Sequence, residues 1–329
     1  MKRSAKTIFV IYLILIATGA IAQTKILFNA CKAETAANAD WVPDADVFNL
    51  GFSSGPAVVG DGNEANPQIV PTPAQSGITS STAESFWKGA LSSWGVELVK
   101  QGYVVETLPY NGLITYGNSS NPQDLSHYAV FIDCEPNILY TAAEKTAILQ
   151  FVQSGGGLFM VSDHTSSDRN NDGYDSPEIW DDLMTNNGVV NNPFGMNFDL
   201  ANFSQTTTNI PTLPGDPLLH GIIGNVTQCQ WSAGTSMTIS TTANSSVKGV
   251  VYKTGSSFGN TGVMVAYATY GAGKVVGFGD SSPCDDGSGD TNDQLYDGWL
   301  GDASGNHRIL ILNATIWLAT PTLIPTLYL

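Results

Sequence analysis

Basic residues are scarce in this chain. Its 329 residues include 13 lysines and arginines against 29 aspartates and glutamates, which gives a formal net charge of −16 at pH 7. Lys2, Arg3 and Lys6 precede the first apolar run, so the chain beyond that run is more acidic still. An acidic surface repels phosphate backbones, and we therefore expect no nucleic acid among the partners. Small molecules, glycans and divalent cations suit such a surface better.

Cysteines are also few: Cys31, Cys134, Cys229 and Cys284. Their wide spacing excludes a dense disulfide framework, and the chain has no CxxC or Cys/His zinc pattern. An oxidising compartment permits one disulfide, but the sequence does not say which two cysteines form it. Cys134 as a nucleophile would need a nearby base and a lowered pKa, and the sequence indicates neither, which favours a plain thiol or half of a disulfide.

Long apolar runs are absent after residue 22. The one such run, residues 7–22, follows the basic start and ends in the small-x-small sequence Ala20-Ile21-Ala22. This pattern predicts a secretory signal peptide over residues 1–22. The run is shorter than the ~20 apolar residues of a membrane helix, although an uncleaved anchor is the alternative. We therefore expect a mature chain without a membrane span, either secreted or in the periplasm or at the cell surface.

Strand and helix patterns alternate along the rest of the chain. Apolar strands are predicted at residues 25–30, 103–108, 128–133 and 158–162, and a hairpin at 262–280. Helices are predicted at residues 84–101, 141–154 and 307–318, the second with a capping box of Thr141 and Glu144. This alternation predicts one α/β domain over residues 23–320 with a mostly parallel sheet. Residues 185–260 are interpreted as a β-rich elaboration of it, and residues 321–329 as a loose tail.

Polar side chains follow four of the predicted strands. Glu34 follows the first strand, Glu135 the third, Asp163 and His164 the fourth, and Asp280 the last. Ligands of open parallel sheets bind beyond the carboxyl ends of the strands, so we expect these residues on one rim. Asp163 and His164 are candidates for general acid and base, helped by Glu34 or Glu135, with Asp280 as an orienting group or ligand. His164 also fits a purely structural place at a strand end.

An acidic loop follows the fourth strand. Its sequence DRNNDGYD resembles the first half of an EF-hand calcium loop, and the potential ligands are Asp168, Asn170, Asp172 and Asp175. The match is partial because the twelfth position is Ile179, with Glu178 one residue early. A bound Ca²⁺, an acidic turn without metal and a transition-metal site are the alternatives. Oxygen ligands favour the hard cation, so Ca²⁺ is the cofactor that we expect.

Four segments together resemble a known superfamily. They are TAAEKTAILQFVQSGGGLFMVSDH (141–164), DPLLHGI (216–222), VAYATYGAGKVVGFGDSS (265–282) and NATIWL (313–318). In this order they resemble the class I glutamine amidotransferase-like superfamily, and within it the trehalose-utilisation-type and related secreted α/β proteins. The resemblance implies a flavodoxin-like sheet with helices on both faces and the first strand central. It also implies that Glu34, Glu135, Asp163, His164 and Asp280 lie together.

The chain departs from that superfamily at the catalytic elbow. Ser162, Asp163 and His164 stand where the amidotransferases carry a nucleophilic cysteine, and the chain has no GxCxG motif and no late His-x-Glu pair. Glutaminase activity is therefore not expected. Three functions remain open: a metal-assisted hydrolase of an extracellular glycan or ester, a non-catalytic calcium-stabilised module that binds a ligand or glycan, and a structural part of a larger surface protein. The oligomeric state also remains open.

Overall fold

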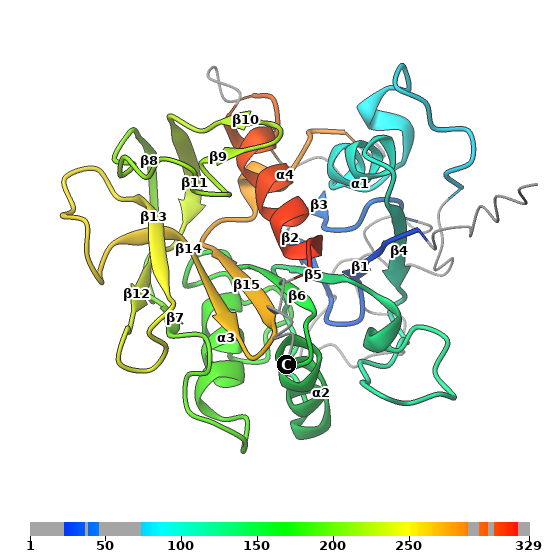
Figure 1. Ribbon diagram of the computed structural model, residues 1–329, viewed down its shortest axis with the longest axis horizontal. Coiled ribbons are helices and arrows are strands. Elements are labelled where there is room, and N and C mark those ends of the chain that lie inside the picture. The colour runs from blue at the N-terminus through cyan, green and yellow to red at the C-terminus, as the bar shows by residue number, and fades with distance from the viewer. Residues whose placement is uncertain (1–22, 37–38, 46–73, 289–295, 302–305, 322–329) are drawn as a thin grey trace, which may run out of the picture.

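A nine-stranded sheet forms the centre of the molecule (Figure 1). The structure is a computed structural model, and it describes residues 23–36, 39–45, 74–288, 296–301 and 306–321. Five strands of the sheet are parallel and lie in the order β4-β1-β5-β6-β15. Their bounds are Val104–Leu108 (β4), Lys25–Asn29 (β1), Val130–Cys134 (β5), Gly157–Val161 (β6) and Gly273–Phe278 (β15). Counted along the chain, this is the flavodoxin-like order 2-1-3-4-5, which confirms the expected fold and the interior position of the first strand.

Antiparallel strands extend the sheet beyond β15. They are β14 (Val263–Tyr270), which forms the predicted hairpin with β15, and β13 (Lys248–Tyr252), β12 (Met237–Ile239) and β7 (Met196–Phe198). Three of these strands come from residues 185–260, so this segment adds to the main sheet. The smaller pairs are β8 (Phe203–Thr207) with β11 (Cys229–Gly234), β9 (His220–Gly221) with β10 (Gly224–Asn225), and β2 (Thr35–Ala36) with β3 (Ala39–Asp40).

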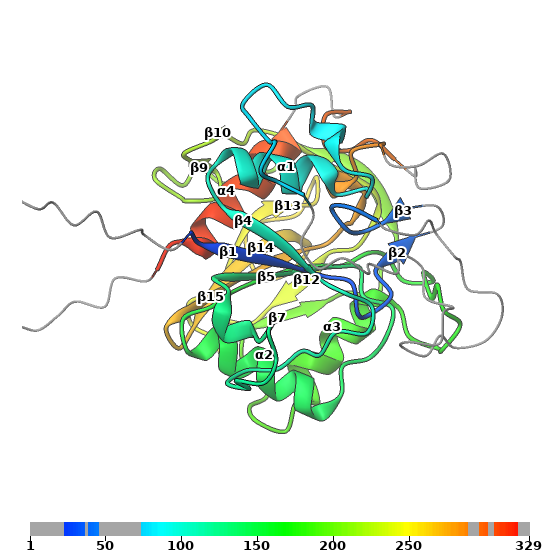
Figure 2. The same cartoon turned by 90° about the vertical axis from the view of Figure 1, so that its right-hand side faces the viewer.

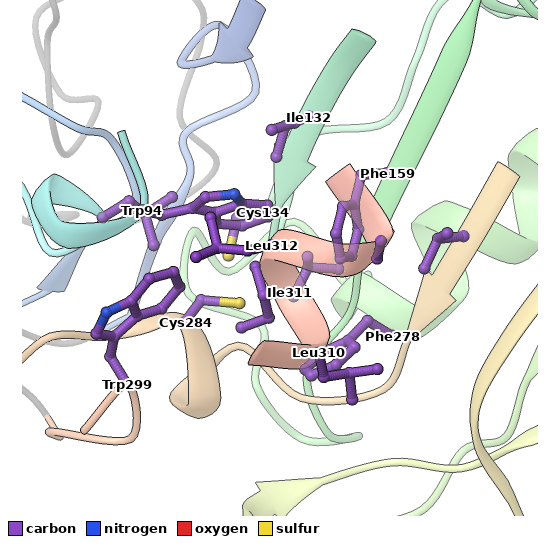
Figure 3. Close-up of a cluster of buried hydrophobic side chains, with 14 of the residues drawn as sticks. Trp94, Ile132, Cys134, Phe159, Phe278, Cys284, Trp299, Leu310, Ile311 and Leu312 are labelled. Atoms are coloured by element: carbon purple, nitrogen blue, oxygen red, sulfur yellow. The ribbon is translucent and has the colours of Figure 1, made fainter. Parts of the chain in front are cut away.

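Helices cover both faces of the sheet (Figure 2). Helices α1 (Ser92–Lys100) and α4 (Asn306–Ala319) lie on one face, and α2 (Ala142–Gln153) and α3 (Ser176–Thr185) lie on the other. Figure 3 shows the core under α4, where Leu312 lies near Trp94 and Phe159. The rings of Trp94 and Phe159 pack edge to face with centroids 5.0 Å apart. Two layers of buried apolar side chains therefore hold the sheet between the helices.

The helix predicted over residues 84–101 is wrong in its first half. A short 3-10 helix, η1, covers Glu84–Phe86, and α1 begins only at Ser92. The amides of Gly89, Ala90 and Leu91 donate to carbonyls of residues 40–43, so their bonds run across to another segment instead of along a helix. A side chain at Gly89 would meet the backbone there, since an added Cβ would lie 1.8 Å from the carbonyl oxygen of Val42. Long-range packing thus overrides the local apolar pattern.

The other helix ends follow local signals. The predicted capping box at Thr141 and Glu144 is present at the start of α2. Helix α3, which was not predicted from the sequence, begins after Asp175, whose backbone amide donates to the Glu178 carboxylate at 2.9 Å.

In the described part of the chain, no helix has the length and apolar character needed to cross a bilayer. The predicted signal peptide at residues 1–22 and residues 322–329 of the tail lie outside the described residues.

Candidate active site at the carboxyl edge of the sheet

Three of the predicted carboxylates meet at the carboxyl ends of neighbouring strands. Glu135 follows β5, Asp163 comes two residues after β6, and Asp280 comes two residues after β15. All three side chains are buried. The three carboxyl groups are close enough to act on one another electrostatically. The parallel order of β5, β6 and β15 is what collects these acids.

Arg169 joins two of these carboxylates. Its Nη2 donates to Oδ2 of Asp163 at 2.8 Å, and its Nε donates to Oε1 of Glu135 at 3.1 Å. The other oxygen of Glu135, Oε2, accepts from Nε1 of Trp41 at 2.8 Å and from Oγ of Ser281 at 2.6 Å. Glu135 is thus held by three donors from three separate parts of the chain. Arg169, Trp41 and Ser281 were not predicted from the sequence as site residues. Arg169 carried a signal, because it is the one basic residue within the acidic loop.

The surroundings of Asp163 raise its pKa. Burial raises the pKa of Asp163 well above its usual value, the charges of Glu135 and Asp280 raise it further, and the Arg169 guanidinium opposes the shift. A carboxyl group with a raised pKa keeps its proton to a higher pH than usual, which suits it to general acid catalysis.

Asp280 links two segments that border the site. Its Oδ2 accepts from the amide of Ser232 at 2.5 Å, and its Oδ1 accepts from the amide of Ser282 at 2.9 Å. Burial raises the pKa of Asp280 to about 8, although these two bonds oppose the shift. Asp280 itself does not line the cavity described below, so its geometry suits the orienting role more than direct contact with a ligand.

His164 lies beside Asp163 at the rim. Its Nε2 is 3.5 Å from Oδ2 of Asp163, and its Nδ1 is 2.6 Å from the carbonyl oxygen of Thr165. A carbonyl oxygen only accepts, so Nδ1 carries a proton and Nε2 of the neutral ring is the basic nitrogen. The Asn202 amide, 2.8 Å from Nδ1, agrees with this assignment when its oxygen faces the ring. His164 therefore presents an acceptor toward Asp163.

A polar cavity of about 270 Å³ opens onto this group. Its lining consists of Ala36, Asp163, His164, Arg169, Ser232, Ala233, Ser281, Ser282 and Tyr296. A larger cavity of about 340 Å³ lies at the opposite edge of the sheet, beside Tyr128 and Gly156, and its described lining includes no carboxylate or histidine. Of these two cavities the smaller is the candidate site, because it combines a carboxyl group with a raised pKa, an imidazole and a guanidinium.

The backbone around this cavity is strained at two positions. Glu135 has φ 53° and Ala233 has φ 61°, the left-handed region that residues other than glycine adopt rarely. The angle at Glu135 turns its carboxyl group toward Trp41 and Arg169 directly after the strand ends. Backbone strain of this kind persists only where the surrounding structure imposes it, and it is concentrated at functional sites.

Glu34 belongs to a second buried acidic cluster. Its two carboxylate oxygens accept from the amide of Lys32 at 2.9 and 3.0 Å, and the nearby charge of Asp133 adds to burial in raising its pKa. Burial raises the pKa of Asp133 to about 6, although Asn29 and Tyr140 donate to the carboxylate at 2.6 and 2.5 Å. Glu34 therefore does not line the cavity, whereas Asp163 does, and the expectation that Glu34 belongs to the same site is not met.

The acidic loop is curled by its own hydrogen bonds. Oδ1 and Oδ2 of Asp168 accept from the amides of Asp172 and Gly173 at 3.1 and 2.9 Å. The side-chain Nδ2 of Asn170 donates to Oδ2 of Asp172 at 3.0 Å and to the backbone carbonyl oxygen of Asn137 at 2.5 Å. Asp168, Asn170 and Asp172 therefore stay together in one turn. Since Arg169 lies in the same turn, the loop also positions the guanidinium of the site.

Asp175 faces a different turn. Its carboxylate accepts from Oγ1 of Thr165 at 2.9 Å and from the amides of Ser166 and Ser167 at 2.6 and 2.8 Å. No cluster of three or more histidines, cysteines or acids suited to a metal is present in the parts of the chain that the structure describes. Asp168, Asn170 and Asp172 offer oxygen ligands of the type that Ca²⁺ uses, and calcium binding stays a prediction.

Comparison with solved structures bears on the fold alone, and one of them superposes well enough to support it. The N-terminal domain of mmIFT52 superposes with a TM-score of 0.50 at 12% identity, over 91% of this chain and 100% of that one. The cytoplasmic protein STM3548 from Salmonella typhimurium gives a TM-score of 0.39 at 14% identity, over 69% and 86% of the chains. A beta-galactosidase from Rahnella sp. R3 gives 0.36 at 14% identity, over 69% of this chain and 27% of the enzyme. No protein-family model and no curated protein matches the chain.

Proposed function

We propose that this chain is an exported hydrolase and that the cavity at the carboxyl edge is its active site, with a small polar ester as the substrate class. The observation that carries the proposal is the buried Asp163 carboxyl group, whose Oδ2 lies 3.5 Å from Nε2 of His164 and 2.8 Å from Nη2 of Arg169. A carboxyl group that keeps its proton is a general acid, and a neutral imidazole is a general base. Both groups line or border one polar cavity.

The spacing of the acids favours an ester over a glycoside. The two carboxyl groups of glycosidases are about 5–5.5 Å apart in retaining enzymes and about 6.5–9.5 Å apart in inverting ones. Arg169 bonds Asp163 and Glu135 through two nitrogens of one guanidinium, at 2.8 and 3.1 Å, and this draws the two carboxyl groups closer together than either arrangement. The assigned acid and base, Asp163 and His164, are 3.5 Å apart, which suits attack and departure at a single carbonyl carbon.

The chemistry follows from these positions. Nε2 of His164 takes a proton from water as the water oxygen attacks the ester carbonyl, and Asp163 gives its proton to the departing alkoxide oxygen. The proton on His164 then returns across 3.5 Å to the Asp163–Glu135 pair. Arg169 and the protonated His164 together offset the charge of the two carboxylates after Asp163 has lost its proton. Calcium in the acidic loop would act only by holding the turn that carries Arg169.

A second candidate is a binding module for a hydroxyl-rich ligand such as a sugar. It is favoured by the cavity wall, where the serines 232, 281 and 282 and Tyr296 supply hydroxyl groups. Arg169 also neutralises Glu135 and Asp163 without any ligand. Under this alternative the same residues bind a ligand and no bond is broken.

Kinetics with coloured readouts separate the candidates. We expect the purified protein to hydrolyse an alkyl ester, whose alkoxide needs a proton to leave, in an assay that follows acid release with a coloured pH indicator; Asp163→Asn and His164→Gln should lower the turnover by roughly 10²–10⁴-fold. Asp181→Asn is the matched control, because burial also raises the pKa of Asp181, to about 7, but this residue lies in α3 outside the cavity. Its turnover is expected to stay unchanged.

Three outcomes contradict the ester proposal. Turnover of 4-nitrophenyl glycosides but not of esters overturns the substrate class. Equal activity in wild type and Asp163→Asn overturns the assigned acid. Binding of a simple sugar that Asp163→Asn abolishes, without turnover of any substrate, establishes the binding module instead.

A further inference from the structure

Two cysteines from distant parts of the chain meet in the core. Cys134 is the last residue of β5, and Cys284 is the last residue of the 3-10 helix η3 (Ser282–Cys284). Figure 3 shows the two sulfur atoms near each other, beside Trp94 and Leu312, and Cys284 is close enough to raise the pKa of the Cys134 thiol. Both thiols are free in the structure, and the side chains are 2% and 0% exposed. Two neighbouring thiols are the starting point from which a disulfide forms.

We propose that Cys134 and Cys284 form a disulfide under oxidising conditions, while Cys31 and Cys229 remain thiols. Glutathione disulfide is a sufficient oxidant. Two S–H bonds break and one S–S bond forms between the cysteines, while the S–S bond of glutathione disulfide accepts two electrons and two protons and yields two glutathione thiols.

The surroundings favour this pair. The residues around both sulfur atoms are apolar and belong to one core cluster, so a disulfide replaces two weakly polar thiols without leaving a charge unpaired. Cys31 packs in the cluster on the other face of the sheet, beside Lys32 and Glu34. The sheet therefore separates Cys31 from the pair.

Burial also determines when the bond can form. Exchange needs a thiolate, and burial raises the pKa of the Cys134 thiol well above its usual value. The folded reduced protein should therefore oxidise slowly, and the bond should form while the core is still open. Once formed, it is shielded from reductants by the same packing.

The bond would fix part of the candidate active site. Cys134 directly precedes Glu135, and Cys284 follows Ser281 by one short turn. Ser281 donates to Glu135 at 2.6 Å, so the disulfide would tie together the two segments that this hydrogen bond already joins. The inference rests on the packing of the two thiols and holds whatever the cavity binds.

Peptide mapping tests the proposal directly. The chain is refolded with reduced and oxidised glutathione, free thiols are alkylated, and a protease digest is analysed by mass spectrometry. We expect one cross-linked peptide pair that contains Cys134 and Cys284, and alkylated Cys31 and Cys229. Four alkylated cysteines, or a bridge to Cys31 or Cys229, overturn the proposal.

Melting curves supply a second test. The disulfide would close a long loop, so dithiothreitol should lower the melting temperature of the oxidised protein by about 5–15 °C. The double variant Cys134→Ala/Cys284→Ala should show no response to dithiothreitol, whereas the matched control Cys31→Ser/Cys229→Ser should keep the full response. A response in the first variant or its loss in the second contradicts the assignment. Should a variant fail to fold, the peptide map of the natural chain decides.

Discussion

Replacing Arg169 by glutamine tests the electrostatics of the candidate site without reference to any substrate. The change removes the cation that bonds both Asp163 and Glu135, at 2.8 and 3.1 Å. Removing one partner of a buried ion pair costs about 3–5 kcal/mol, because the remaining charge stays buried. The Arg169 side chain is 26% exposed, so water weakens the pair. We therefore expect a loss of about 2–3 kcal/mol at pH 8, or roughly 5–10 °C in melting temperature.

The loss from Arg169→Gln should depend on pH. The pKa of Asp163 is already raised in the folded protein, and removing the guanidinium raises it further. A carboxyl group can have a higher pKa in the folded protein than in the unfolded chain. Such a group lowers the free energy of unfolding as the pH rises from the pKa of the unfolded chain toward the pKa of the folded protein. Asp163 is less ionised at pH 5 than at pH 8 in both proteins, so the difference in melting temperature should be smaller at pH 5.

Circular-dichroism melting curves at pH 5 and pH 8 measure this difference. Arg308→Gln is the matched control: Arg308 also bonds two acids, Glu97 at 2.5 Å and Glu84 at 3.8 Å. Glu97 keeps Lys100 at 3.0 Å after that change, so the loss should be smaller, about 1 kcal/mol. Equal losses of stability from Arg169→Gln at both pH values would contradict the assigned role of Arg169 as the cation that stabilises Asp163 and Glu135. A loss at pH 8 no larger than that of Arg308→Gln would contradict it as well.

Three further predictions address the whole chain. The melting temperature of the wild type in calorimetry should fall from pH 5 to pH 8, because burial raises the pKa of Asp280 to about 8 and that of Asp181 to about 7. Over this range the folded state holds protons that the unfolded chain has released. Asp181→Asn should make the melting temperature less dependent on pH, and an unchanged dependence contradicts this assignment. Millimolar Ca²⁺ should raise the melting temperature by several degrees over EDTA, about 2.7 kcal/mol at a hundredfold excess over Kd, and Asp172→Ala should abolish most of the effect. Coincident curves would leave the acidic run as a solvated loop. N-terminal sequencing of the exported protein should begin at Gln23, and a start at Met1 would contradict the signal peptide.

The amino-acid sequence alone determined the parallel core. Short apolar runs alternating with helical patterns predict β1, β4, β5 and β6 within one or two residues of their observed bounds, and β15 as the second arm of a hairpin, because burial on both faces leaves a continuous apolar signal. The rule that ligands bind at the carboxyl ends of strands then directed attention to Glu135, Asp163 and Asp280. Strand ends are local features, and topology alone brings them together.

Tertiary structure decided which side chains meet. Glu34 also follows a strand of the parallel core, yet it turns to the amide of Lys32, and nothing in the local pattern distinguishes it from Glu135. Glu135 reaches Arg169 because its φ of 53° redirects the chain, an angle imposed by packing and not by residue type.

The helix that begins at Ser92 instead of residue 84 has the same origin. Residues that were expected in its first turns donate their backbone amides to carbonyl oxygens of residues 40–43. These acceptors lie far away in the sequence, so a local pattern does not predict such bonds. The contact between Cys134 and Cys284 likewise exists only after the sheet has brought the end of β5 to the turn at η3. Periodicity records which residues are buried, whereas the partner of each buried group depends on contacts between distant segments that form only in the folded chain.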